Sequence, residues 1–100
     1  MKVLCLRLRI KDTEEALLSF LKKAIPVYEA IEGIHIRILR NTNDPSRFIE
    51  IVEYATDDAF ESDQRRVAED RQMKTLLAEW HALLADAVEV EIFEDLTSKI

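Results

Sequence analysis

Apolar and polar side chains alternate along the first residues of the chain. In residues 3–10, VLCLRLRI, every second position from Leu4 to Ile10 is a large aliphatic residue. Because successive side chains of a strand point to opposite faces, this period of two predicts a β-strand. The same alternation recurs in residues 34–40 (IHIRILR), 47–54 (RFIEIVEY) and 88–95 (VEVEIFED). We therefore predict four strands.

The stretch between the first two strands has the spacing of a helix. Apolar residues recur every three or four positions within residues 12–33, as they do along one face of an amphipathic helix. Asp12 or Thr13 can cap its N-terminus, and Gly33 is a natural stop. Pro26 has no backbone N–H, so it predicts a kink or a break just before it.

A second helical stretch follows the third strand and begins at Thr56, which favours the N-cap position. One helix over residues 56–86 would span roughly 45 Å, whereas an eight-residue strand spans roughly 26 Å. We therefore expect two helices, with the break in the polar residues 68–72. Trp80 lies on the apolar stripe of the second one.

The order strand, helix, strand, strand, helix, strand is the βαββαβ pattern of the ferredoxin-like α+β fold. Residues 41–46, NTNDPS, are turn formers that join the middle strands as a hairpin. Right-handed crossovers then give a four-stranded antiparallel sheet in the order 4-1-3-2, with the helices on one face. We predict one domain over residues 1–100.

The alternation also predicts the two faces of the sheet. We expect Ile49, Ile51, Val90 and Ile92 to pack under the helices. The helix-free face is expected to hold Val3, Cys5, Arg7, Arg9, His35, Arg37, Leu39, Phe48, Glu50, Val52, Tyr54, Glu89, Glu91 and Phe93. The arginines of the first strand would then oppose the glutamates of the last strand and form ion pairs.

This mixture is too apolar for full exposure and too charged for a dry core. We therefore expect the helix-free face to be partly buried against the same face of a second copy, which would make a dimeric α+β barrel. A monomer with a solvated sheet is the alternative.

The net charge and the N-terminal residues indicate which classes of partner and which cellular location to expect. The formal net charge is −6, which repels phosphate backbones, so we expect no nucleic-acid partner. Arg7 and Arg9 interrupt the first apolar run, unlike a signal peptide, and no apolar run is long enough to span a membrane. The single cysteine, Cys5, fits a reducing compartment. We expect a cytoplasmic protein that does not bind membranes.

Residues 47–61, RFIEIVEYATDDAFE, contain Phe48, the pair Glu53 and Tyr54, and the pair Ala59 and Phe60. This segment resembles the one that leads from the third strand into the second helix in the dimeric α+β barrel superfamily, and most of all in its antibiotic biosynthesis monooxygenase-like branch. The resemblance implies a homodimer with small-molecule cavities between sheet and helices. Some members oxidise aromatic substrates with oxygen and without a metal or flavin, so the resemblance implies this activity as one possibility.

The sequence also departs from that superfamily. Many relatives carry a histidine a few residues beyond the Ala-Phe pair, where this chain has residues 62–64, SDQ. The haem-degrading members have an asparagine in the first strand and a tryptophan and histidine spaced apart. Here the first strand has no asparagine, and Trp80 and His81 are adjacent. Other members are isomerases or have no known activity, so the resemblance does not choose a reaction.

Three residues are candidates for catalysis. His35 and Glu50, beside Arg37, could transfer a proton to or from a bound substrate. The alternative is that these residues only form ion pairs with one another and have no catalytic role. Tyr54 could hydrogen-bond a phenolic substrate, or place its ring in the core.

The candidate ligand-binding residues are Arg7, Arg37, Tyr54, Trp80 and Phe93. The three aromatic ones would help to enclose an aromatic or polyketide-like molecule, although core packing is the alternative for Trp80. Two distant histidines and one cysteine form no cluster with ligand spacing, so we expect no metal site. We also expect no cofactor.

Two functions of different classes remain open. One is a cofactor-independent monooxygenase acting on a small aromatic or polyketide-like substrate. The other is a non-catalytic dimeric barrel that binds a metabolite or has a role in assembly.

Overall fold

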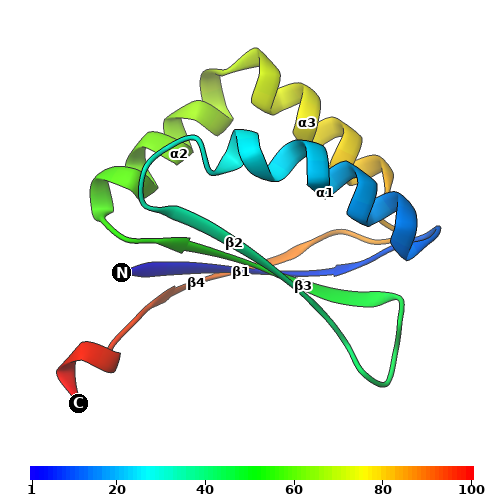
Figure 1. Cartoon of the computed structure of the whole chain (residues 1–100), viewed down its shortest axis with the longest axis horizontal. Coiled ribbons are helices and arrows are strands. Elements are labelled where there is room, and N and C mark those ends of the chain that lie inside the picture. The colour runs from blue at the N-terminus through cyan, green and yellow to red at the C-terminus, as the bar shows by residue number, and fades with distance from the viewer.

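The computed structural model describes residues 1–100. Its elements are β1 (Lys2–Arg9), α1 (Glu14–Tyr28), β2 (Ile34–Arg40), β3 (Arg47–Tyr54), α2 (Asp57–Glu69), α3 (Arg71–Ala82), β4 (Glu89–Glu94) and a 3-10 turn, η1 (Thr97–Lys99). The strands form one antiparallel sheet in the order β2-β3-β1-β4. The three helices lie on one face of that sheet (Figure 1). The predicted ferredoxin-like α+β fold and strand order are confirmed.

Helix α1 begins at its predicted cap, since the Thr13 hydroxyl accepts a hydrogen bond from the Ala16 N–H. The predicted break at Pro26 is wrong, because α1 continues through it to Tyr28. Pro26 and Lys22, whose carbonyl would otherwise accept from residue 26, are both exposed, so water can satisfy that carbonyl. Gly33 is not the helix stop either. It lies in the turn before β2 with φ 91°, a conformation that glycine adopts without strain.

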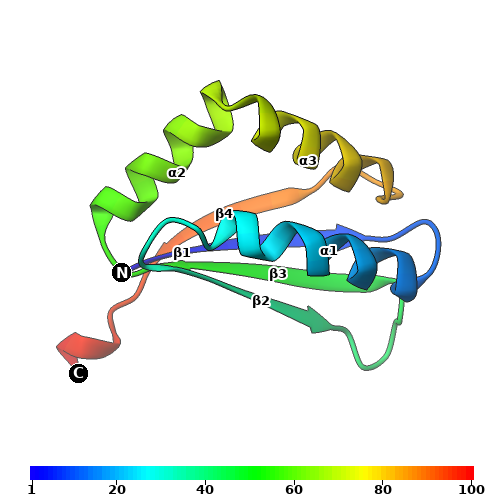
Figure 2. The same ribbon diagram turned by 45° about the horizontal axis from the view of Figure 1, so that its top comes forward.

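The predicted division of the second helical stretch is confirmed. Asp70 donates its N–H to the Arg66 carbonyl at the end of α2, and its carboxylate accepts from the Gln72 N–H at the start of α3. One residue thus closes one helix and caps the next. Figure 2 shows the bend between α2 and α3.

The predicted orientation of β3 is wrong. Glu50 is the direct partner of Leu6 on β1 and of Ile38 on β2, and directly opposed residues share a face. Glu50 therefore lies on the helix side, as do Phe48, Val52 and Tyr54, and all four are buried. The other side chains of β3, including Ile49 and Ile51, lie on the helix-free face. Both faces of this strand carry large apolar residues, so its alternation could not orient it.

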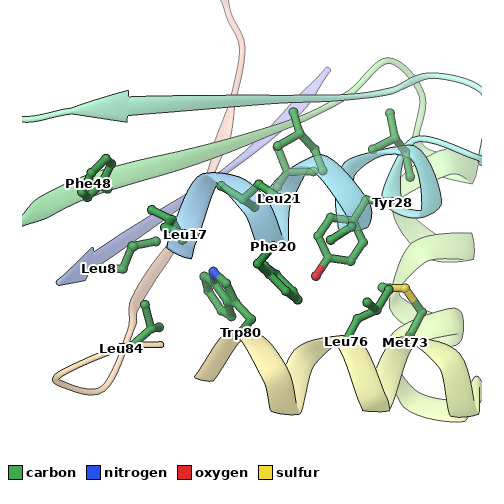
Figure 3. Close-up of a cluster of buried hydrophobic side chains, with 14 of the residues drawn as sticks. Leu8, Leu17, Phe20, Leu21, Tyr28, Phe48, Met73, Leu76, Trp80 and Leu84 are labelled. Carbon is green, nitrogen blue, oxygen red and sulfur yellow. The ribbon is translucent and has the colours of Figure 1, made fainter. Parts of the chain in front are cut away.

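The core fills the space between the sheet and the helices. Its most buried members include Leu17, Leu21 and Ala24 of α1 and Tyr54 of β3. Figure 3 shows α1 and α3 facing each other, with Trp80 of α3 pointing into the space between them. This layer of apolar side chains provides most of the driving force for folding.

Strand β4 is less covered than the sequence predicted. Val90 and Ile92 point to the helix side, opposite Leu6 and Leu4 of β1, yet they are 54% and 58% exposed. The expectation that they pack under the helices is wrong. β4 is an edge strand that packs mainly against β1, so its helix-side face is largely exposed. None of the helices has the length and apolar run that crossing a membrane requires.

Candidate active site

A cavity of about 90 Å³ lies between the sheet and the helices. Strands β1, β2 and β3 form its floor, and side chains from all three helices form its walls. Most of these side chains are aliphatic. The polar groups among them belong to Tyr28, Glu50, Tyr54, Asp63 and Trp80. An apolar pocket with a few polar groups is the usual form of a small-molecule site.

Glu50 is the unusual member of this cavity. Its side chain is 6% exposed, and its Oε1 atom is buried without a hydrogen-bond partner. Burial disfavours the charged form and raises the pKa of Glu50 from 4.5 to about 7. The carboxyl group can therefore both accept and release a proton near neutral pH.

Trp80 and Tyr28 supply two further polar atoms. The Nε1 of Trp80 is buried without a partner, and it points away from α3, toward Leu8 and Leu17 (Figure 3). Burial, followed by the nearby Glu50 carboxylate, raises the pKa of the Tyr28 hydroxyl. That hydroxyl stays protonated at neutral pH, so it is available in the cavity as a hydrogen-bond donor. The Trp80 N–H points toward side chains that do not line the cavity.

Tyr54 belongs to a buried polar network. Its hydroxyl donates to Asp63 Oδ2 over 2.5 Å, while Arg66 Nη2 donates to Asp63 Oδ1 over 2.7 Å. Arg66 also donates to the carbonyl oxygens of Val27 and Tyr28 at the end of α1, over 2.7 and 2.8 Å. Burial, and then the hydrogen bond to Asp63, raises the pKa of Tyr54. The network ties β3, α2 and α1 together at one end of the cavity.

Sequence reasoning missed Asp63 and Arg66 as members of the site. A signal was present, because Ala59, Asp63 and Arg66 follow one another at intervals of four and three residues. That spacing puts them on the face of α2 that carries Ala59 into the core. A buried carboxylate on that face needs a cation within reach.

The candidate catalytic residues lie on opposite faces of the sheet. His35 is on the helix-free face with 66% of its side chain exposed, and its Nδ1 lies 3.3 Å from Glu29 Oε2. Arg37 is exposed on the same face. The predicted proton-transfer group of His35, Glu50 and Arg37 is therefore wrong. Glu50 and Tyr54 do line the cavity.

The five candidate ligand-binding residues are likewise divided. Tyr54 and Trp80 line the cavity, whereas Arg7, Arg37 and Phe93 lie across the sheet from it. Phe93 therefore cannot enclose the same molecule as Tyr54 and Trp80.

The predicted ion pairs between the first and last strands are present only in part. Arg7 Nε lies 3.5 Å from Glu91 Oε1. Arg9 pairs instead with Asp44 and Asp86. No group of three or more His, Cys, Asp or Glu side chains lies close enough together to hold a metal ion.

The fold places this chain among ferredoxin-like α+β proteins, with a cavity between the sheet and the helices. No family model matches the sequence, and no curated protein matches it. Several solved structures are similar to this chain in fold. A mutant of SnoaB, a cofactor-independent oxygenase from Streptomyces nogalater, superposes with a TM-score of 0.79 and 15% identity, over 94% of this chain and 91% of SnoaB.

Two further structures are assigned to the antibiotic biosynthesis monooxygenases. The one from Nitrosomonas europaea has a TM-score of 0.77 and 17% identity over 96% of this chain and 90% of its own. The one from Bordetella bronchiseptica has a TM-score of 0.71 and 18% identity over 94% of this chain and 96% of its own. At such identities the similarity is one of fold, and it confirms at that level the resemblance carried by residues 47–61.

Proposed function

We propose that the protein is a cofactor-independent oxygenase that acts on a small hydroxylated aromatic molecule in the cavity. The observation that carries this proposal is Glu50, an unpartnered carboxyl in an apolar pocket with a pKa of about 7. A general base is most effective when its pKa is near the operating pH. The similarity in fold to SnoaB, which is a cofactor-independent oxygenase, supports the same reaction class.

The reaction needs no external reductant. Glu50 takes the hydroxyl proton of a phenol, and the electron-rich ring that results forms a carbon–oxygen bond with dioxygen. The hydroperoxide loses the ring proton at that carbon and expels water, so that one phenol and one dioxygen give one quinone and one water. The substrate supplies all the electrons. The Tyr28 hydroxyl, which lines the cavity, is a donor available to stabilise the anion.

Oxygen consumption by the purified protein with a panel of phenols tests this proposal. Glu50→Gln should lower the rate by roughly 10² to 10⁴, the usual contribution of a general base. Glu53→Gln is the matched control, because Glu53 is on the same strand but faces the opposite side of the sheet. A Glu50→Gln variant as active as the parent would exclude Glu50 as the base. Absence of oxygen uptake with every phenol would favour the non-catalytic alternative, a dimeric barrel that binds a metabolite.

We also infer that two copies pair through the helix-free face to form a dimeric α+β barrel. With β3 oriented as observed, this face loses Phe48, Val52 and Tyr54 and gains Ile49 and Ile51, which join Val3 and Cys5. Phe93 is 47% exposed at its edge. Apolar area of this kind on one face of a sheet is typical of an interface. The acidic and basic side chains on the same face allow complementary pairing between two identical surfaces.

A further inference from the structure

The cavity is closed on one side and open on the other. Most of its lining side chains are buried, Glu50 among them. The partly buried ones are Leu4 and Leu6 of β1, Val67 of α2 and Leu77 of α3. Because solvent reaches the cavity where its lining is exposed, the mouth lies between β1 and the helices α2 and α3. Figure 2 shows these two helices on the β4 side of the sheet and α1 on the β2 side.

An exposed apolar surface continues from this mouth onto β4. Ile92 and Val90 are the cross-strand partners of Leu4 and Leu6, and directly opposed residues share a face of the sheet. Neighbouring strands lie about 5 Å apart, so these two side chains lie directly beside the floor of the cavity. They are 58% and 54% exposed. We refer to Val90 and Ile92 as the β4 shelf.

The volume of the cavity requires an aromatic ligand to reach out through the mouth. The cavity measures about 90 Å³, whereas a cavity of about 150 Å³ is enough for benzene. The core side chains around it are close-packed and leave little room for expansion. A phenol whose hydroxyl lies at Glu50 therefore has the far end of its ring at the mouth, beside Leu4 and Leu6. A substituent on that end of the ring passes over the β4 shelf.

The chemistry of the shelf defines this substituent. Both of its side chains are aliphatic and form no hydrogen bonds. The next residue on this face of β4 is Glu94, whose Oε1 lies 3.7 Å from the N-terminal amine of Met1. An apolar group that covers the shelf gains affinity in proportion to the apolar area that it removes from water. A polar group in the same place would lose hydration without gaining a partner.

We propose that the ligands of this cavity are phenols with an alkyl substituent, whose hydroxyl lies at Glu50 and whose alkyl chain lies on the β4 shelf. The phenol part of the ligand rests on the proposed function. The mouth, the size limit and the apolar chain come from the cavity and the shelf, and they do not depend on the reaction.

Binding under nitrogen, measured by titration calorimetry at pH 7, tests this inference without requiring turnover. The probes are phenol, 4-ethylphenol, 4-butylphenol and 4-hexylphenol, because position 4 is the end of the ring opposite the hydroxyl. We expect the affinity to rise about twofold for each added carbon. A fully buried methylene gives about fourfold, and the shelf covers only one side of the chain. 4-Hexylphenol should therefore bind roughly 60-fold more tightly than phenol.

A double variant assigns this gain to the shelf. Val90→Asn combined with Ile92→Asn should lower the ratio of the 4-hexylphenol affinity to the phenol affinity to about 10 or less, because the chain then lies against hydrated amide groups. Leu18→Asn is the control, since Leu18 is 47% exposed but belongs to α1, and the ratio should not change. Circular dichroism checks that each variant is folded, and the probe series on the unchanged protein tests the inference even where a variant is not.

Affinities that do not depend on chain length, an unchanged ratio in the folded double variant, or no binding of any probe would overturn this inference. A shelf covered by a second copy would give the first of these results, and the double variant would then also sediment differently from the parent protein. Failure of the inference can be told apart from failure of the proposed function. Affinity that rises with chain length, without oxygen uptake, would refute the oxygenase and leave the inference standing. Oxygen uptake with phenol and equal affinities for all probes would do the opposite.

Discussion

At the residue scale, Glu50 combines two properties that conflict in a stable core. It occupies the middle of β3 on the face that packs against the helices, where an aliphatic side chain would be more stable. Its neighbours on that face, Phe48 and Val52, are apolar and buried. A carboxyl group retained in such a place is a candidate for function, because the cavity keeps its pKa near 7.

Glu50 should make stability depend on pH. Between pH 4.5 and about 7 it is protonated in the folded protein and ionised in the unfolded chain, so the free energy of unfolding falls as pH rises through that window. Above about pH 7, Glu50 is ionised in both states, and the free energy of unfolding no longer changes with pH because of this group. The total loss is about 3 kcal/mol, since each pKa unit corresponds to roughly 1.4 kcal/mol.

Urea unfolding at pH 5 and pH 8 measures this effect. In the Glu50→Gln variant, most of this decrease of about 3 kcal/mol in the free energy of unfolding between pH 5 and pH 8 should be absent. The variant should therefore be more stable than the parent protein at pH 8. The other ionisable groups around the cavity, Tyr28, Tyr54, Asp63 and Arg66, are the same in both proteins, so the comparison isolates Glu50. Identical pH profiles would show that its pKa is not raised.

The network around Asp63 makes a second prediction. The side chains of Asp63 and Arg66 are only 11% and 14% exposed, so Asp63→Asn leaves a buried guanidinium without its counter-charge. We expect a loss of about 3 kcal/mol in the free energy of unfolding. Tyr54→Phe removes one hydrogen bond and should cost about 1 to 2 kcal/mol. Glu61→Gln, an exposed change on the same helix, is the control and should stay within about 0.5 kcal/mol.

At the scale of elements, the strands and the α2–α3 division could be predicted from the sequence because each has a local cause. Alternation defines a strand, and a capping aspartate at the edge of a polar stretch divides two helices. The burial of the apolar side chains of β4 does not follow from the sequence of this strand. Its apolar residues alternate as regularly as those of β1, but their burial depends on whether a helix lies above them.

Matched substitutions in two strands test this difference. Ile92→Thr should change the free energy of unfolding of the protomer by less than about 1 kcal/mol, because Ile92 is 58% exposed. Ile36→Thr, in the buried part of β2, should cost about 2 to 3 kcal/mol through lost apolar burial and a buried hydroxyl. Equal costs would mean that β4 is covered in the folded protein.

At the scale of the whole molecule, the sheet separates two surfaces with different roles. The helix side encloses the cavity, and the helix-free side carries the proposed dimer interface. His35, Arg37 and Phe93 belong to the second surface. We expect their substitution to alter pairing between copies more than binding in the cavity.

Sedimentation at micromolar concentration tests the interface. Ile51→Lys places a charge at the middle of the helix-free face, between Cys5 and Arg37. It should convert a dimer into a monomer, because an unpaired buried charge is costly. Leu18→Lys changes an exposed leucine of α1 on the far side of the helix layer and should leave the dimer intact. A monomeric parent protein would refute the interface.

About half of the candidate site could be predicted from the sequence. The chemistry of Glu50, Tyr54 and Trp80 marks them in the sequence as candidates, and they do line the cavity. Their grouping with His35 and Arg37 was wrong, because grouping depends on which face each strand presents. Asp63 was missed because an acid on a helix is usually solvated, and only the fold brings Tyr54 and Arg66 to it.

The four strands, their order and the ferredoxin-like pattern follow from the sequence alone, because alternation and helical spacing are local properties of the chain. The orientation of β3, in contrast, depends on how the strands pair in the folded protein. The hairpin closes with the Asn41 N–H donating to the Arg47 carbonyl, and this register places Glu50 beside Ile38. A shift of one residue would have turned Ile49 and Ile51 toward the helices and Glu50 away from them. Both faces of β3 carry large apolar residues, so it is the pairing with β1 and β2 that fixes Glu50 on the side of the cavity.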